Sequence, residues 1–446
     1  MSRARRFASF ALVAAVALPP SLVASNWPQW RGPSGQGISD DSRAPSTWTP
    51  DTNVAWRTAI PGRGHSSPVI WNDRVFLTTA IEGDLVPDHQ AVRHEVGGQE
   101  FVHPDAVSGD RAQTLKVLAL DVATGATVWE RTAYEGPVYD SRHRRGSFAS
   151  STPVTDGETV YVSFGSEGVY AYGFDGTLRW KSDIGRIRTL GLGTASSPIL
   201  FEQWLILQCD ENEGERSFIV ALDKGTGKEA WRVARPVEVS WSTPVIVDAG
   251  GRLELVANGT EFVIAYDPRT GRELWRTKGV ESNAIHTPLV GHGLVFVTAG
   301  FPAKRVIAIR PGGSGDITGT DRIAWRYDKG TAYVATPILY GDYVYLITDN
   351  GILTCLDART GEVKYEGGRV PVPARFMGSP VAIDGTLLLT SEDGDTFVIK
   401  AGPTHEVIRT NSVDEPVFAS LAIAQGRVFV RGERHLYCLS GERRGG

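Results

Sequence analysis

Cysteine is scarce in this chain of 446 residues, which contains three cysteines and two methionines. So small and odd a number excludes a fold held together by a framework of disulfides. Cys355 (in LTCLD) and Cys438 (in LYCLS) occupy a position that similar segments fill with alanine at 119, 171, 221, 265 and 308. Both are therefore predicted to be small buried residues that stand in for alanine.

Long hydrophobic runs are also lacking. A basic start precedes a 12-residue apolar run, Phe7 to Leu18, which is too short to span a bilayer as a helix, and no longer apolar stretch follows. Small residues come next, which predicts a signal peptide with cleavage near Ser25 and Asn26. The Arg5-Arg6 pair leaves twin-arginine export open beside general secretion, which we favour. No cysteine lies near the cleavage site, so no lipid anchor is expected, and the predicted location is periplasmic or secreted.

Charge of one sign is not in large excess, since the formal net charge is −5 at pH 7. Nucleic-acid binding depends on Lys and Arg contacts to phosphates, so no nucleic-acid partner is expected. The chain is instead rich in turn-forming residues, with 50 Gly and 25 Pro beside a hydrophobic content of 41%. This composition is typical of an all-β chain with many short strands.

A hydroxyl residue followed by proline recurs along most of the chain, with leucine replacing proline in the last copy. The second residues of these pairs are 41 to 49 residues apart, except for a first gap of 85. A self-similar period of this length indicates a propeller or a solenoid. The hydroxyl residues are Ser67, Thr152, Ser197, Thr243, Thr287, Thr336, Ser379 and Ser420.

One repeat is clear from residue 335 onward. ATPIL, YVYLIT, ILTCLD and EVKY have the length and β-branched or aliphatic character of strands, and turn residues bound them. Four such antiparallel strands form one propeller blade. The last turn reads A-x-D-x-x-T-G, as in AYDPRTGRELW (265–275), where Asp and Gly suit a tight turn. The aromatic residue that follows is predicted to fill the wedge between blades; these residues are Trp56, Trp129, Trp180, Trp231, Trp275, Trp325 and Tyr365.

The sequence thus predicts an all-β fold, an eight-bladed β-propeller of four-stranded antiparallel blades. Trp56 precedes the first inner strand, so VAWRTAI (54–60) is predicted to close the ring by pairing with residues 435–439, which removes exposed edges. Cys355 and Cys438 then lie in blades six and eight, and since a disulfide needs Cα atoms within about 7 Å, both are predicted to stay free. The hydroxyl residues are predicted to form one structural layer near the axis, where the inner strands converge.

Several segments fall outside the repeat. Residues 81–113 are interpreted as an insertion in the first blade, and residues 310–321 lengthen a turn of the fifth. Three tryptophans are expected to hold the segment before the ring onto it. The predicted parts of the chain are a signal peptide (1–25), an extended arm (26–52), the propeller (53–440) and a tail (441–446).

The A-x-D-x-x-T-G-x-x-x-W units resemble the repeats of the pyrroloquinoline-quinone-like propeller superfamily, over about residues 53 to 440. The family includes quinoprotein alcohol dehydrogenases and the non-enzymatic propeller subunit of the outer-membrane barrel-assembly machinery. The start WPQWRGPSGQG also resembles exported propellers of planctomycete-type bacteria. The dehydrogenases imply adjacent cysteines beside the quinone, and this chain has none; their calcium ligands find no counterpart here. The assembly subunit is usually a lipoprotein, and its lipid-bearing cysteine is missing.

Other motifs with chemical potential are interpreted as structural. GTGK (225–228) resembles a phosphate-binding loop, but Glu229 replaces the required Ser or Thr, so it is read as a blade turn. The acidic run at 210–215 lacks the spacing of a calcium loop and is read as a solvated hairpin tip. Three histidines of the first insertion could ligate zinc, but a surface loop is favoured; they are His89, His94 and His103. No metal site is predicted.

The residues just before each inner strand are expected to meet at one mouth of the central channel. Converging polar and aromatic groups at a concave mouth are a ligand-site hypothesis. Arg142, Phe376, Glu415 and Phe418 are expected nearby, with any ligand above the hydroxyl layer. The candidate ligand-binding residues are His65, Arg144, Arg145, Trp241, Asn283, His286, Tyr333 and Arg375.

The function expected from these observations is a non-enzymatic binding or assembly platform that is exported. Its partner is expected to be an envelope protein or a small-molecule ligand at the channel mouth. No cofactor and no catalytic residue are assigned. Two alternatives stay open: an oxidoreductase of the alcohol or sugar dehydrogenase type that uses pyrroloquinoline quinone with Ca²⁺, and a hydrolase or lyase that uses the channel mouth.

Overall fold

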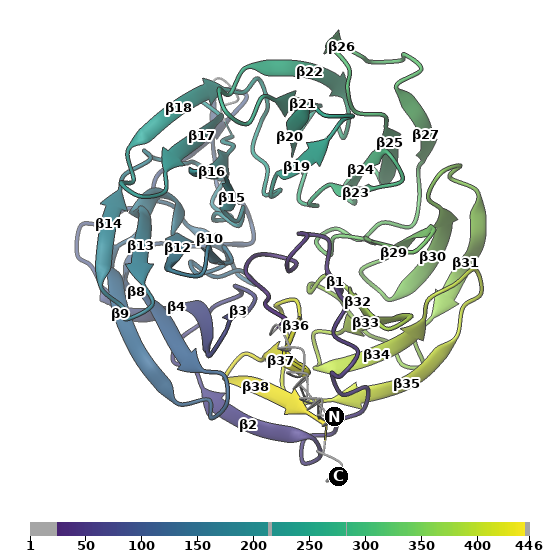
Figure 1. Ribbon diagram of the computed structural model, residues 1–446. Coiled ribbons are helices and arrows are strands. Elements are labelled where there is room, and N and C mark those ends of the chain that lie inside the picture. The colour runs from purple at the N-terminus through teal and green to yellow at the C-terminus, as the bar shows by residue number, and fades with distance from the viewer. Residues whose placement is uncertain (1–24, 213–215, 282, 442–446) are drawn as a thin grey trace, which may run out of the picture.

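Eight four-stranded antiparallel sheets form a closed ring around a common axis (Figure 1). The computed structural model describes residues 25–212, 216–281 and 283–441. The predicted signal peptide, except for its last residue, and most of the predicted tail lie outside the described residues. Within that described part, the single helical element is the 3-10 turn Gly165–Glu167. The predicted eight-bladed all-β propeller is confirmed.

The first four blades follow the chain in order, each with its innermost strand first. Blade one contains β3 (Val69–Trp71), β4 (Arg74–Leu85), β8 (Arg111–Asp121) and β9 (Thr127–Pro137). Blade two contains β11 (Val154–Thr155), β12 (Thr159–Ser163), β13 (Val169–Gly173) and β14 (Leu178–Ser182). Blade three contains β15 (Ile199–Phe201), β16 (Trp204–Cys209), β17 (Phe218–Asp223) and β18 (Glu229–Ala234). Blade four contains β19 (Val245–Asp248), β20 (Leu253–Asn258), β21 (Phe262–Tyr266) and β22 (Glu273–Lys278).

The remaining blades repeat this order until the last one. Blade five contains β23 (Leu289–Gly291), β24 (Leu294–Ala299), β25 (Arg305–Ile309) and β27 (Ile323–Tyr327). Blade six contains β28 (Ile338–Tyr340), β29 (Tyr343–Ile347), β30 (Ile352–Asp357) and β31 (Val363–Arg369). Blade seven contains β32 (Val381–Ile383), β33 (Thr386–Thr390), β34 (Asp395–Lys400) and β35 (Val407–Ser412). Blade eight contains β36 (Ala422–Ala424), β37 (Arg427–Arg431), β38 (His435–Ser440) and β2 (Val54–Ala59).

The ring is closed by a strand from the start of the propeller. β2 pairs antiparallel with β38, with Trp56 opposite Cys438 and Ala59 opposite His435. The main-chain N–H of Ile60 extends the pairing by donating to the carbonyl of Arg434 at 2.8 Å. The predicted closure is therefore confirmed, and it leaves blade eight with strands from both ends of the chain (Figure 1).

The outer-strand tryptophans dock on the turn of the next blade. The indole N–H of Trp56 donates to the carbonyl of Val122 at 3.0 Å. The ring lies against Gly125, where φ is +73° and an added Cβ would come within 2.5 Å of the indole, so the turn requires glycine. The same donation reaches the following blade from Trp129, Trp180 and Trp325. The wedge role predicted for these aromatic residues matches these contacts.

The repeated hydroxyls form a directional hydrogen-bonded belt. The main-chain N–H of Ser67 donates to Thr152 Oγ1 at 2.9 Å, and five more blades donate in the same way to the next blade. The other five bonds run from Thr152 to Ser197, Ser197 to Thr243, Thr287 to Thr336, Thr336 to Ser379, and Ser379 to Ser420. Among the described residues, the steps from blade four to five and from blade eight to one lack this bond. The predicted hydroxyl layer is thus a set of joints between blades.

A second polar layer, which the sequence analysis missed, lies at the ends of the second strands. Gln208 donates its side-chain amide to the carbonyl of Asn258 at 2.7 Å, and Asn258 donates to the carbonyl of Thr298 at 3.3 Å. Arg431 donates to the carbonyl of Thr78 at 2.6 Å. These side chains are buried, so each bond between blades satisfies groups that water cannot reach.

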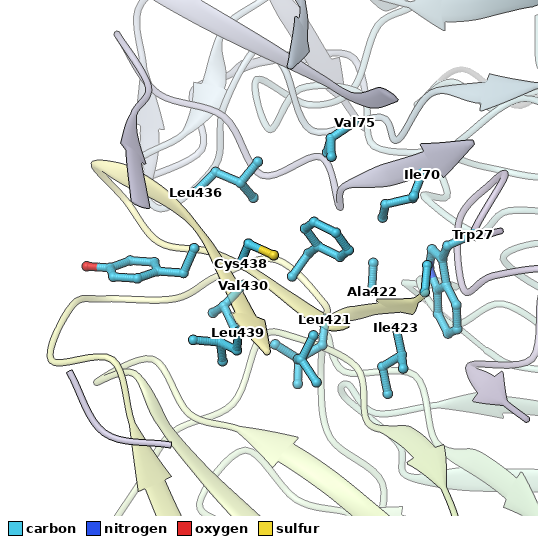
Figure 2. Packing of buried hydrophobic residues seen from close by; sticks show 14 of the residues in the cluster. Trp27, Ile70, Val75, Leu421, Ala422, Ile423, Val430, Leu436, Cys438 and Leu439 are labelled. Atoms are coloured by element: carbon cyan, nitrogen blue, oxygen red, sulfur yellow. The ribbon is translucent and has the colours of Figure 1, made fainter. Parts of the chain in front are cut away.

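The arm before the ring crosses the end of the molecule that carries the turns between first and second strands. Trp27 is buried against blades one and eight, and its main chain exchanges two hydrogen bonds with Ile70. Figure 2 shows Trp27 beside Ala422 and Ile423 of β36. Further along, β1 (Ile38–Ser39) adds to blade seven by pairing parallel with β32. The arm therefore links blades that are distant in the sequence.

The insertion of blade one is shorter than predicted. The ladder between β4 and β8 continues to the pair Leu85 and Arg111, so residues 86–110 leave the blade, not 81–113. That segment forms the hairpin β5 (His94–Val96) and β6 (Gln99–Phe101), followed by β7 (Ala106–Val107), which pairs with β10 (Arg142–His143). In blade five, β26 (Gly315–Asp316) of the other long turn pairs with β22 of blade four.

Candidate functional site

The strand order sends two sets of loops to one end of the ring. Every blade starts its innermost strand at the same end, and neighbouring strands are antiparallel. The loops that lead into each blade therefore share one mouth with the turns between second and third strands. The arm contacts the opposite end.

A cavity of about 440 Å³ opens at this mouth. Its volume lies in the range of small-molecule sites, and every blade or its entry loop contributes to the wall. Most of the wall belongs to short loops that the belt of hydroxyls holds at their bases. The charged and aromatic wall residues are Trp30, His65, Asp105, His143, Arg144, Arg145, Trp241, Tyr333, Asp349, Arg375, Phe376, Glu392 and Phe418.

Most of the candidate residues converge on this cavity. The structure places six of them on its wall, namely His65, Arg144, Arg145, Trp241, Tyr333 and Arg375. Asn283 is not part of the wall, but its side-chain amide donates to the hydroxyl of Tyr333 at 3.3 Å. Their role in ligand binding stays a prediction.

The placement of His286 at the mouth is wrong. Ile285 and Thr287 line the cavity, and because successive residues of an extended chain point to opposite sides, His286 points into the ring. Its imidazole is 1% exposed, and its Nδ1 lies 2.6 Å from Thr298 Oγ1. Burial, followed by the charge of Arg31, lowers the pKa of His286 to about 4. His286 is therefore a buried neutral residue.

Glu415, expected near the mouth, does not line the cavity and is part of the ring closure. Its carboxylate is 2% exposed and accepts hydrogen bonds from the main-chain N–H of Arg434 and of His435. It is also bonded to His435 Nδ1 at 2.7 Å and accepts from the hydroxyl of Tyr437 at 2.8 Å. All three partners lie at the start of β38, so Glu415 fixes the strand that β2 joins.

Arginines surround the imidazole of His65. The ring lies on Phe418 with centroids 5.0 Å apart. Burial, and then the positive charges of Arg63, Arg431, Arg142 and Arg145, lower the pKa of His65 to about 3. The imidazole is thus neutral at pH 7, and the potential at this wall of the cavity is positive.

Two of the three arginines on the wall are paired. Arg144 lies 2.9 Å from Asp105 of the insertion, and Arg145 forms an ion pair with Glu392. Arg375 is exposed, and its guanidinium has no ion pair or hydrogen bond with any described residue. Its main-chain carbonyl accepts from the N–H of Glu392 at 2.8 Å, which places Arg375 and Arg145 on the same side.

The floor of the cavity contains a residue of the arm. Trp30 lines the cavity, and its indole N–H donates to Thr287 Oγ1 at 3.0 Å. Arg31 follows, is buried, and donates to the carbonyl of Pro337 in blade six at 3.1 Å. In Figure 1 the dark purple arm runs from the rim to the centre of the ring. The sequence showed three tryptophans in the arm but gave no signal that one of them reaches the axis.

The other groups considered from the sequence are dispersed. His94 pairs with Asp140 at 2.8 Å, His89 lies 3.1 Å from the carbonyl of Val138, and His103 accepts from the N–H of Asp105. His89 and His94 thus tie the insertion to residues outside it, whereas the contact of His103 lies within the insertion. Among the described residues, no three His, Cys, Asp or Glu side chains are close enough to share a metal ion.

All three cysteines are buried free thiols. Cys355 and Cys438 lie within the sheets of blades six and eight, as predicted, and burial raises the pKa of both to about 12. Neither these two nor Cys209 is part of the cavity wall. In the described part of the chain, no helix is long and apolar enough to cross a membrane.

The eight-bladed ring and the repeated Asp–Gly turns with their tryptophans define a propeller of the quinoprotein-like class. A family model described as "Outer membrane protein assembly factor BamB" matches residues 46–197 and 215–368, so the chain belongs to this family. No match was found among curated proteins.

Solved structures support the fold at low sequence identity. BamB from Moraxella catarrhalis is 14% identical with a TM-score of 0.55, covering 83% of this chain and 99% of that chain. A europium-containing methanol dehydrogenase is 11% identical with a TM-score of 0.61, covering 91% and 89%. The quinohemoprotein alcohol dehydrogenase from Comamonas testosteroni is 12% identical with a TM-score of 0.60, covering 95% and 82%. At these identities the likeness concerns the fold alone.

The described residues do not fit a quinone site that contains calcium. Ca²⁺ takes six to eight oxygen ligands, whereas two of the three carboxylates on the cavity wall, Asp105 and Glu392, are paired with arginines. The third, Asp349, accepts the N–H of Tyr333 at 2.8 Å. We therefore derive no chemistry through this cofactor.

Proposed function

We propose that this chain is an exported, non-enzymatic binding platform of the cell envelope, and that it recognises its partner with the mouth that carries the cavity. The observation that carries the proposal is the cavity itself. Loops from all blades build it, and its wall combines arginines with buried and half-buried aromatic side chains. Arginine and aromatic residues in a desolvated hollow are the side chains that dominate binding energy in protein interfaces.

Among its described residues, the cavity wall has one pair of a histidine and a carboxylate, His143 and Asp105 at 3.7 Å, but no hydroxyl that is hydrogen-bonded to a histidine. A nucleophile needs a base within hydrogen-bond reach. The belt hydroxyls accept main-chain N–H groups, and His65 is surrounded by arginines. The contact between His286 and Thr298 pairs an imidazole with a hydroxyl, but it is buried in the ring. These observations favour binding over hydrolysis.

Family membership supports the same proposal. The matching family model carries the description of an assembly factor for outer-membrane proteins. An assembly factor works through contacts with other proteins, and a closed ring that presents many loops on one face suits that task. The envelope location and the cleaved signal peptide are part of the proposal.

Photo-crosslinking tests the platform. A crosslinking amino acid at Arg144, which is exposed at the mouth, is expected to capture one discrete envelope protein in intact cells. The same amino acid at Arg359, exposed in a turn at the opposite end, is the matched control. Equal adducts at both positions, or none at Arg144, would contradict the proposal. Retention of added quinone and Ca²⁺ with alcohol-dependent dye reduction would support the dehydrogenase alternative instead.

A further inference from the structure

The arm completes the cavity at the joint of blades four and five, which is one of the two joints without a belt bond among the described residues. The belt bond that should run from Thr243 to Thr287 is absent, and the indole of Trp30 donates to Thr287 Oγ1 instead. Trp30 therefore closes the central channel on the side of the arm and presents part of its flat aromatic surface to the cavity. A residue from outside the propeller repeat is thus built into the floor of the site.

The wall above this floor has an excess of positive charge on one side. Arg145 and Arg375 lie next to Glu392, and Arg63, Arg142 and Arg431 lie behind His65. The carboxylates that face these five arginines are Glu392 and, at 4.0 Å from Arg142, Glu82. Arg431 is buried and bonded only to main-chain carbonyls and the hydroxyl of Ser66.

The free guanidinium of Arg375 matches one class of ligand group. A planar guanidinium binds carboxylate or phosphate through paired N–H donors. Phe418, stacked on His65, and the indole of Trp30 offer apolar surface in the same cavity. The cavity of about 440 Å³ is large enough for a small molecule with one ring.

We propose that the cavity binds a small organic anion, with its carboxylate or phosphate group at Arg375 and Arg145 and its flat apolar body on Trp30. This inference rests on the proposed binding function of the same mouth. It needs no metal ion, because the arginines neutralise the anion directly. The arm then determines the depth of the site.

Calorimetric titration of the full chain tests the anion. The probes are 3-phenylpropionate, phenyl phosphate, the neutral 3-phenylpropanamide and inorganic phosphate. Either organic anion is expected to bind at least tenfold more tightly than the amide and than inorganic phosphate, and the tighter of the two identifies the anionic group. Equal affinity for the amide, or for inorganic phosphate, would overturn the proposal.

Matched variants locate the anion. Arg375→Gln is expected to weaken binding of the organic anion at least tenfold, whereas Arg359→Gln at the opposite end leaves it unchanged. Trp30→Leu is expected to weaken binding of 3-phenylpropionate, whereas Trp30→Phe retains most of it because the aromatic face is kept. Unchanged affinity of Arg375→Gln or of Trp30→Leu would overturn the proposed site.

Two spectroscopic signals separate binding from a loss of folding. On addition of 3-phenylpropionate, the indole N–H resonance that disappears in Trp30→Phe is expected to shift. The imidazole of His65 is expected to become easier to protonate, because a nearby anion offsets the arginines. If neither resonance responds while the probe binds, the site lies elsewhere. Crosslinking from Arg144 to a partner without any anion binding would remove this inference and leave the platform intact.

Discussion

We expect that removing the carboxylate of Glu415 weakens the closure of the ring more than any other single substitution of a buried residue at that joint. Glu415 serves four hydrogen-bonding groups at the start of β38, two of them main-chain amides. β38 is the strand onto which β2 closes. The perturbation therefore acts where the two ends of the propeller meet.

The size of the effect follows from the groups left without a partner. In Glu415→Ala, two main-chain N–H groups lose a buried charged acceptor, and hydrogen bonds to charged groups contribute about 1.5–3 kcal/mol each. Part of this loss is recovered by water, so we expect the free energy of unfolding to fall by about 4 kcal/mol. In Glu415→Gln the amide oxygen still serves the two N–H groups, and the expected loss is about 1.5 kcal/mol.

The pH dependence gives an independent check. Burial alone would raise the pKa of Glu415, but hydrogen bonds from His435, the main chain and Tyr437 outweigh burial, so the pKa lies below its ordinary value of 4.5. A carboxyl with a lowered pKa stabilises the fold above the pKa of the unfolded chain, and this stabilisation is lost as pH falls through the folded pKa. The difference between wild type and Glu415→Gln is therefore expected to be full at pH 7 and to shrink below pH 4.5.

Urea unfolding monitored by tryptophan fluorescence, at pH 7 and at two acidic pH values, measures these quantities. Glu433→Gln is the matched control, because Glu433 lies in the same turn with an exposed side chain. A surface change of this kind is expected to alter stability by less than about 0.5 kcal/mol. If Glu415→Ala and Glu433→Gln have the same stability, or if the Glu415→Gln difference does not depend on pH, the closure argument is refuted.

Three further predictions concern the ring. Thr152→Val leaves the main-chain N–H of Ser67 without its acceptor and is expected to cost about 1–2 kcal/mol in urea unfolding; an unchanged midpoint would show that the belt contributes nothing. Trp129→Leu removes the indole bond to Phe174 and opens the wedge, so a loss of about 3 kcal/mol is expected by the same assay, and a loss below 1 kcal/mol would contradict the wedge role. The buried thiols are expected to react with a thiol reagent only after denaturation, and an intact mass two protons lower would reveal a disulfide; the thiols are Cys209, Cys355 and Cys438.

Most of the fold could be predicted from the sequence because the same local interactions recur in each blade of a propeller. The Asp and Gly of each A-x-D-x-x-T-G turn act within a few residues, and Trp56 or Trp129 contacts the same turn one blade later. The closing strand could be predicted because the count of strands left the last blade without an outer strand of its own. The limits of the insertion were missed, because the ladder between β4 and β8 continues through residues that look like loop in the sequence.

The candidate site was harder to predict. Position in the repeat placed His65, Tyr333 and Arg375 at the mouth, but it could not show which way a side chain points. The expectation for His286 was therefore wrong, because its side chain is buried although it lies one residue from a wall position. Trp30 lies outside the repeat, so no periodic argument places it on the floor. The length of the arm and its contacts with several blades decide that position.

The two gaps in the belt divide the propeller into half-rings of four blades. One half runs without interruption from Ser67 to Thr243, and the other from Thr287 to Ser420. At the joint of blades four and five, the hydroxyl of Ser242 donates to the carbonyl of His286 at 2.9 Å, and at the joint of blades eight and one, Arg431 donates to the carbonyl of Ser66. At these two joints, side-chain donors of blades four and eight take the place of the main-chain N–H that donates elsewhere in the belt. The arm adds a further link between the half-rings, because Trp27 packs against blades one and eight, Trp30 is bonded to blade five and β1 pairs with blade seven.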